Sequence, residues 1–151
     1  MAVLVPDGWF YKDETRSSLG LEGFYTTKED IDQTGRFSTG LSVFIYRNFK
    51  TSTEADNFST DLLVKTMHFG TTTKVIGAWD SKTTLLTFHH LQIEAAFPYE
   101  IEVNSNKTIH YVTASLNNTV YLVSFESPSA IWELTFKTIG HIILDNLVLL
   151  R

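Results

Sequence analysis

The sequence predicts an α+β fold in which an antiparallel β-sheet carries one amphipathic helix on each face, an α/β/α sandwich. Three observations lead to this class. β-rich segments follow one another along the chain instead of alternating with helices, which is typical of antiparallel sheets. Two segments, 51–67 and 128–144, carry apolar residues at helical spacing. The strands of the last third are apolar on both sides, which indicates a sheet covered on both faces.

The first half of the chain supplies β segments and the first helix. Trp9 follows a Pro-Asp-Gly turn and is expected to return to the core. Segments 19–26 and 39–47 alternate as strands do. Thr51 and Glu54 then form a capping box that starts a helix. Its predicted core-facing stripe consists of Ala55, Phe58, Leu62, Leu63 and Met67.

Further strands are predicted in the middle of the chain. Segment 71–80 contains Val75, Ile76 and Trp79, and Trp79 is expected to belong to the core and not to a ligand site. Segment 85–96 forms a long strand. Pro98 breaks that strand, and residues 100–103 or the strand that starts at Thr108 are its expected partners.

A β-hairpin is predicted in the last third, with its turn at Asn117-Asn118. Asn tolerates the positive φ that both central positions of a two-residue type I′ loop need. Such a loop fixes the register. It would pair Ala114 with Tyr121, Val112 with Val123, and His110 with Phe125.

The second helix is expected to begin after the hairpin, capped by Ser127 with Pro128 at its first position. Its stripe consists of Trp132, Phe136, Ile139 and Ile143, and the side chains expected to widen it are Ile131, Leu134 and Ile142. Gly140 within this pattern suggests a close packing contact, because glycine is unfavourable in a helix. Asp145-Asn146 ends the helix, and residues 147–150 are predicted to form a short final strand.

Length and charge narrow the classes of function. A chain of 151 residues is expected to form a single domain, 1–151. A formal net charge of −5 without a basic stripe argues against binding of nucleic acid. No apolar run is long enough to span a membrane. The absence of cysteine excludes disulfides and thiolate metal sites. The start at Met1-Ala2 shows no signal peptide, which predicts either a cytosolic protein or a mature domain without its leader.

Several landmarks resemble the PsbP-like family, within the wider Mog/PsbP/DcrB α/β/α-sandwich group. They occur in the same order over nearly the whole chain and consist of Val5-Pro6-Asp7-Gly8-Trp9, Gly40-Leu41-Ser42-Val43, the helix from Thr53, Ile109-His110-Tyr111, Val120-Tyr121-Leu122-Val123, Pro128 with Trp132, and Ile143-Leu144-Asp145-Asn146-Leu147.

The resemblance implies a non-enzymatic accessory or assembly protein outside the cytoplasm, exported or lipid-anchored through residues missing here. The resemblance also implies the α/β/α-sandwich fold of that group. Photosystem members of the family influence calcium, chloride and manganese binding at their partner complex. This chain lacks the Lys-rich character of the plant subunit, so that role does not carry over. Neither the partner nor the oligomeric state follows from the sequence.

No catalytic, cofactor-binding or metal-binding residue is assigned. His89 and His90 are neighbours on a strand and point to opposite faces, so they cannot share one ion. A His89–His110 or His90–His110 pair across neighbouring strands is the sharper alternative. The carboxylates of segment 29–32 suit calcium by chemistry, but their spacing matches no complete binding loop. No nucleophile elbow, phosphate loop or zinc-protease motif occurs.

Three hypotheses follow. The first is an accessory protein that presents a surface to a protein partner or to the cell envelope. The second is a carrier of a small hydrophobic ligand, in an apolar cavity between sheet and helix. Its lining would come from five aromatic residues, Phe24, Phe44, Phe88, Phe97 and Phe125. The third is an enzyme, such as a hydrolase, with His89, His90 or His110 as its base.

Overall fold

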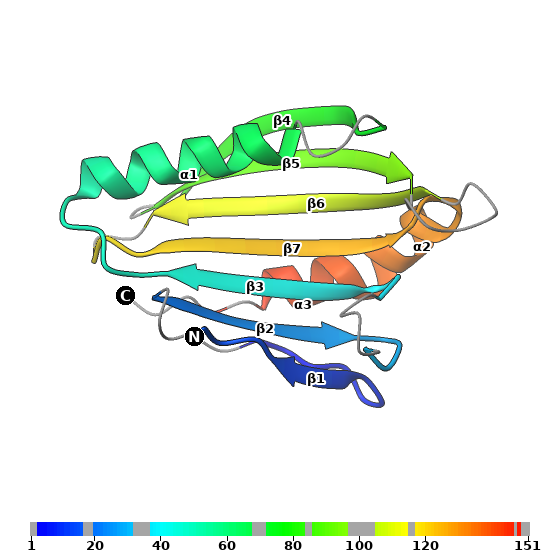
Figure 1. Cartoon of the computed structure of the whole chain (residues 1–151). Coiled ribbons are helices and arrows are strands. Elements are labelled where there is room, and N and C mark those ends of the chain that lie inside the picture. Colours follow the sequence, from blue (N-terminus) through cyan, green and yellow to red (C-terminus); the bar gives the residue numbers. More distant parts are fainter. Residues whose placement is uncertain are drawn as a thin grey trace.

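The computed structural model describes residues 3–16, 20–31, 37–67, 72–83, 86–96, 105–114, 117–146 and 148. Its centre is a seven-stranded antiparallel sheet in the order β1-β2-β3-β7-β6-β5-β4 (Figure 1). The strands are β1 Phe10–Asp13, β2 Leu21–Thr27, β3 Gly40–Tyr46, β4 Lys74–Lys82, β5 Thr87–Ala96, β6 Ser105–Ala114 and β7 Val120–Pro128. β1 and β4 are therefore the two edges of the sheet.

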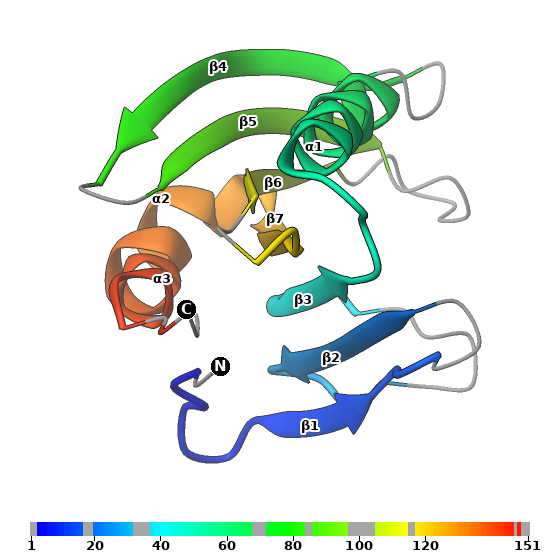
Figure 2. The same cartoon turned by 90° about the vertical axis from the view of Figure 1, so that its left-hand side faces the viewer.

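Helices lie on opposite faces of this sheet, as Figure 2 shows in a view along it. α1, Ser52–Met67, packs over β5, β6 and β7 on one face. The other face carries a C-terminal helical segment of four successive parts, η2 Ser129–Ile131, α2 Trp132–Thr135, η3 Phe136–Gly140 and α3 His141–Asp145. The predicted class, α+β with an antiparallel sheet between helices, is confirmed. Among the described residues, no helix has the length and apolar character needed to cross a membrane.

The start of α1 follows from its capping residues. The backbone N–H of Glu54 donates to Oγ1 of Thr51 at 3.2 Å, and the Glu54 carboxylate accepts from the Lys50 N–H at 2.8 Å. The predicted capping box is thus present, with Glu54 reaching one residue beyond the cap. Ala55 is fully buried and Phe58 packs with it against the sheet, as the apolar stripe predicted.

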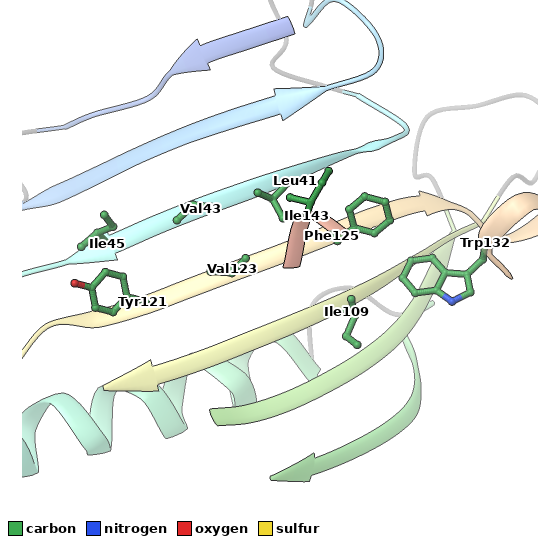
Figure 3. Packing of buried hydrophobic residues seen from close by; sticks show 9 residues of the cluster. All are labelled: Leu41, Val43, Ile45, Ile109, Tyr121, Val123, Phe125, Trp132 and Ile143. Atoms are coloured by element: carbon green, nitrogen blue, oxygen red, sulfur yellow. The ribbon is translucent and has the colours of Figure 1, made fainter. Parts of the chain in front are cut away.

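The larger core lies between the sheet and the C-terminal helical segment (Figure 3). Phe125 is fully buried there, and its ring centroid lies 6.0 Å from those of Trp132 and Phe136. Trp9 packs against this core from the N-terminal side, as predicted. The buried members are Leu41, Val43, Ile45, Ile109, Tyr121, Val123, Phe125, Trp132 and Ile143.

The hairpin register differs from the prediction by one residue. β6 and β7 pair Ala114 with Val120, Val112 with Leu122, and His110 with Ser124. Asn118 has a φ of 53°. A two-residue loop at Asn117-Asn118 would pair Ala114 with Tyr121, so the observed register excludes the predicted two-residue type I′ loop. Because side chains alternate with a period of two, this one-residue shift exchanges the faces of β6 relative to β7. His110 therefore faces Ser124 and not Phe125.

The predicted cap of the second helix is also wrong. Ser127 pairs with Lys107, and β7 continues through Pro128. Pro128 has φ −53° and ψ 135°, an extended conformation, and the helical segment begins only at Ser129 without a side-chain cap. The ladder to β6 keeps Ser127 in the strand, so it cannot act as a helix cap.

In the C-terminal helical segment, the predicted apolar stripe is buried, but the side chains predicted to widen it are exposed. Trp132 and Ile143 are buried as predicted, whereas Ile131, Leu134 and Ile142 are 44%, 67% and 41% exposed. These three side chains point away from the sheet. The sequence pattern could not separate the two groups, because both recur at helical spacing.

Gly140 makes the predicted close contact. A Cβ at this position would lie 2.7 and 2.9 Å from ring atoms of Phe125 and 2.9 Å from the ring of Phe136. The helix therefore approaches the sheet most closely where it has no side chain. The wider π turn, η3, ends at this residue.

Some predicted features lie outside the described residues. These are the start of the first long strand at Leu19, the break at Pro98, the segment 100–103 and most of the final strand 147–150. The other predicted strands, 39–47, 71–80 and 85–96, are found as β3, β4 and β5.

Candidate functional site

The three strand histidines do not converge. His90 is opposite Tyr111 and His110 is opposite Leu91, which puts these two histidines on different faces of the sheet. His89 shares a face with His110, but its Nδ1 lies 2.8 Å from Oδ1 of Asp80, on the far side from β7. The His90–His110 alternative is therefore wrong. His89 and His110 do not contact each other either, because His89 pairs with Asp80 and His110 with Ser124.

Two of these histidines contact serine hydroxyls, which the sequence did not reveal. Oγ of Ser81 lies 2.6 Å from Nε2 of His90. Oγ of Ser124 lies 2.6 Å from Nδ1 of His110. The contacts cross neighbouring strands, so they depend on the registers of β4 with β5 and of β6 with β7. No spacing rule within the sequence contains that information.

Within the described part of the chain, neither pair has the third group that activates a serine nucleophile. A serine–histidine base is normally oriented by a carboxylate on the other ring nitrogen. Among the described residues, the second nitrogens, Nδ1 of His90 and Nε2 of His110, are buried without a hydrogen-bond partner. Asp80, the neighbour of Ser81 in the sequence, pairs with His89 on the opposite face. The two contacts are those of packed histidines within a sheet.

Burial keeps both histidines neutral. It lowers the pKa of His110 to about 4. It lowers the pKa of His90 too, and the adjacent Asp80 carboxylate only partly opposes this. The sheet thus holds two uncharged imidazoles whose protonation would cost folding free energy.

A buried carboxyl lies on the α1 face of β7. Burial raises the pKa of Glu126 to about 7; a hydrogen bond from Thr108 opposes the rise and the charge of Glu29 adds to it. Glu29 is occupied within the protein, because its carboxylate accepts from the Ser38 hydroxyl at 2.6 Å and from the Thr39 N–H at 3.0 Å. These two hydrogen bonds join the residues just after β2 to the residues just before β3.

The carboxylate segment 29–32, considered above for calcium, is only partly described, because Asp32 lies outside the described residues. Within the described ranges, no three histidine, aspartate or glutamate side chains gather in an arrangement that holds a metal ion. The Glu29 carboxylate already accepts two hydrogen bonds.

The aromatic residues expected to line one cavity are dispersed. Phe125 fills the core beneath the C-terminal helical segment, whereas Phe44 packs edge-on against Tyr25 on the other face. Phe88 lies near His90, and Phe24 stacks with Tyr11. Phe97 lies outside the described residues. The described members of the set therefore contradict a shared cavity between sheet and helix.

β4 is an exposed edge strand. Every residue of it except Gly77 is exposed, and Val75, Ile76 and Trp79 each have 44% of their surface in solvent. The stretch from Val75 to Trp79 carries no charge, while lysines stand at both ends of the strand. The prediction that Trp79 belongs to the core is wrong. We call this feature the β4 edge.

Trp79 is nevertheless held in place. Its ring stacks on His90 with a centroid distance of 5.1 Å and an interplanar angle of 2°, and His90 meets the edge of Tyr111 at 4.6 Å. Burial raises the pKa of Tyr111 to about 12. This row of rings joins the edge strand to the centre of the sheet and keeps an exposed indole in one orientation.

A groove of about 910 Å³ lies near the opposite edge, over β1, β2, β3 and β7. We call it the β1-side groove. It mixes aromatic rings with amide, carboxylate and guanidinium groups, and it opens on the sheet face that carries the C-terminal helical segment. Residues that characterise it are Tyr11, Asp13, Glu22, Phe24, Arg47 and Asn48.

The comparisons with known proteins agree with the fold. No family model matches the sequence, and no curated protein does. Among solved structures, the chain is similar to cyanobacterial PsbP (CyanoP) from Synechocystis sp. PCC 6803, with a TM-score of 0.58 and 15% sequence identity. The match covers 95% of this chain and 82% of that chain. The protein therefore has a PsbP-like fold.

Proposed function

We propose that this protein is a non-enzymatic accessory or assembly protein that acts outside the cytoplasm by binding a partner protein at the cell envelope. The β4 edge is the observation that carries the proposal. The PsbP-like fold is consistent with the proposal, although a shared fold does not fix a function.

The β4 edge has the properties of a docking strand. None of the described strands pairs with its outer side, because β4 is the last strand in the sheet order. An extended segment of a partner can add to such an edge through main-chain hydrogen bonds, with specificity from alternate side chains. Charged side chains and β-bulges commonly protect edge strands from association. β4 has lysines at its two ends and a register shift at Ile76, but its exposed Val75, Ile76 and Trp79 lie in an uncharged stretch between the lysines.

The histidine geometry supports a role without catalysis. Each serine–histidine contact lacks an orienting carboxylate among the described residues, and His90 is itself 8% exposed beneath Trp79. A general base must reach the proton that it abstracts. The side chain most accessible at this position is the Trp79 indole, which is suited to packing against a partner.

Replacing Ile76 with lysine is expected to weaken partner binding about thirtyfold, because a charge in a desolvated contact costs about 2 kcal/mol. Ile76 lies at a register shift between Val75 and Gly77, so the substitution leaves the paired part of β4 intact. The measurement is the amount of partner that co-purifies with a tagged copy from the native cells, followed by affinity with the identified partner.

Leu134→Lys is the matched control. Leu134 is apolar and even more exposed, at 67%, but it lies on the C-terminal helical segment. The control is expected to retain the partner. Equal loss from both variants, or no loss from Ile76→Lys, would show that the β4 edge is not the binding surface.

A further inference from the structure

The β1-side groove combines an aromatic platform with fixed planar polar groups. The platform is Tyr11, 59% exposed, whose ring stacks on Phe24 at a centroid distance of 5.7 Å and an interplanar angle of 27°. Phe24 packs against the larger core, so the exposed ring is supported from beneath. Such a ring offers a flat apolar face to a ligand while its hydroxyl stays in water.

Arg47 and Glu22 supply the first pair of planar polar groups. Nε and Nη2 of Arg47 donate to the two carboxylate oxygens of Glu22 at 2.8 and 3.0 Å. This hydrogen bonding lowers the pKa of Glu22 and raises that of Arg47, so both remain charged around neutral pH. A guanidinium has five N–H donors. The pair uses two, which leaves three donors in a fixed plane.

Asn48 supplies an amide at the same end of the groove. Its backbone has a φ of 75°, which asparagine tolerates better than most residues. A Cβ on Gly20 would collide with the Asn48 amide, so the glycine leaves room for this side chain. An amide both donates and accepts hydrogen bonds, which suits a hydroxyl group.

The charges of the groove favour an uncharged ligand. Asp13 and Glu22 outnumber Arg47 by one negative charge, which disfavours an anion. Both carboxylates also have partners already, because Asp13 accepts from the Thr15 N–H at 2.8 Å and Glu22 binds Arg47. A cationic ligand would have to compete with these contacts. The groups left for a ligand are the Asn48 amide and the remaining N–H donors of Arg47, beside the aromatic face of Tyr11.

We propose that the β1-side groove binds an uncharged oligosaccharide. One sugar ring stacks its C–H face on Tyr11, and its hydroxyls pair with the guanidinium of Arg47 and the amide of Asn48. The volume of about 910 Å³ has room for more than one ring. This inference goes beyond the proposed function, because the groove lies near the opposite edge of the sheet from β4. Either proposal, the docking strand or the groove, can therefore be wrong without affecting the other.

The test is a titration of the purified protein followed by amide chemical shifts. The probes are tetrasaccharides of glucose and of N-acetylglucosamine, a galacturonate tetrasaccharide as the anionic counterpart, and a lysine-rich peptide as the cationic one. We expect saturable binding of at least one neutral tetrasaccharide, with shifts concentrated around Tyr11, Arg47 and Asn48. Binding of only the anionic or the cationic probe, or of none, would overturn the proposal.

Variants on β1 localise the binding. Tyr11→Ala is expected to weaken it about tenfold and Tyr11→Phe to leave it within about twofold, because stacking needs the ring and not the hydroxyl. Phe10→Ala is the matched control, since Phe10 is 45% exposed on the opposite face of the same strand. Equal weakening by Phe10→Ala and Tyr11→Ala would contradict a site in the groove. If Tyr11→Ala does not fold, the amide shifts of the original protein still locate the site, because shifts that avoid Tyr11, Arg47 and Asn48 would contradict it.

Discussion

Replacing Phe125 with alanine is expected to lower the free energy of unfolding by about 3–5 kcal/mol, the usual cost of removing a buried aromatic ring. Phe125 is fully buried and its ring lies between the sheet and two aromatic residues of the helical segment, Trp132 and Phe136. Its ring also contacts the position of Gly140, so its loss opens a cavity at the closest approach of helix and sheet. Urea unfolding followed by circular dichroism measures the change.

Phe10→Ala again provides the control, because Phe10 is 45% exposed and is not among the described members of either core. We expect it to change the free energy of unfolding by less than about 1 kcal/mol. A loss below about 1 kcal/mol for Phe125→Ala would mean that the C-terminal helical segment does not dock on β7 as described.

Glu126→Gln is expected to stabilise the protein at pH 8 by about 2–3 kcal/mol and to have little effect at pH 4. The pKa of the Glu126 carboxyl rises from 4.5 to about 7 in the folded protein, mainly through burial. Above pH 4.5 the unfolded chain loses this proton while the folded chain keeps it. The folded state therefore loses stability as the pH rises from 4.5 to 7, and glutamine, which does not ionise, removes that loss.

The measurement is the free energy of unfolding of both proteins at several pH values between 4 and 8. Glu22→Gln serves as the comparison, because hydrogen bonds from Arg47 lower the pKa of Glu22 and the pH trend has the opposite sign. A Glu126→Gln curve parallel to that of the original protein would show that the Glu126 carboxyl ionises normally in the folded state.

The sequence predicted the architecture well because the signals for it are local. A capping box at Thr51, helical stripes and consecutive β segments each specify an element without knowledge of its partners. The face to which each strand residue points, and the residues at which elements begin and end, were harder to predict. Asn117-Asn118 allowed more than one loop, and the loop decides the register. Ser127 and Pro128 look like a helix start, yet the ladder to β6 extends β7 through both.

The candidate sites were mostly beyond the reach of the sequence. Trp79 looked like a core residue because nothing local indicates that β4 is an edge, which depends on strand order. The Ser81–His90 and Ser124–His110 contacts depend on registers between strands. The β1-side groove joins Tyr11 to Arg47, residues brought together by the β1-β2-β3 meander. Only the adjacency of His89 and His90 could be interpreted in advance, since neighbours on a strand face opposite ways.

Site-specific photo-crosslinking in the native cells tests the central claim most directly. A photoreactive amino acid replaces Ala78, which is exposed in the regular part of β4, or Lys137, which is exposed on the C-terminal helical segment. Binding through the β4 edge predicts one discrete adduct with an envelope protein from position 78 and none from position 137. Equal adducts from both positions, or none from position 78, would contradict a protein partner at β4.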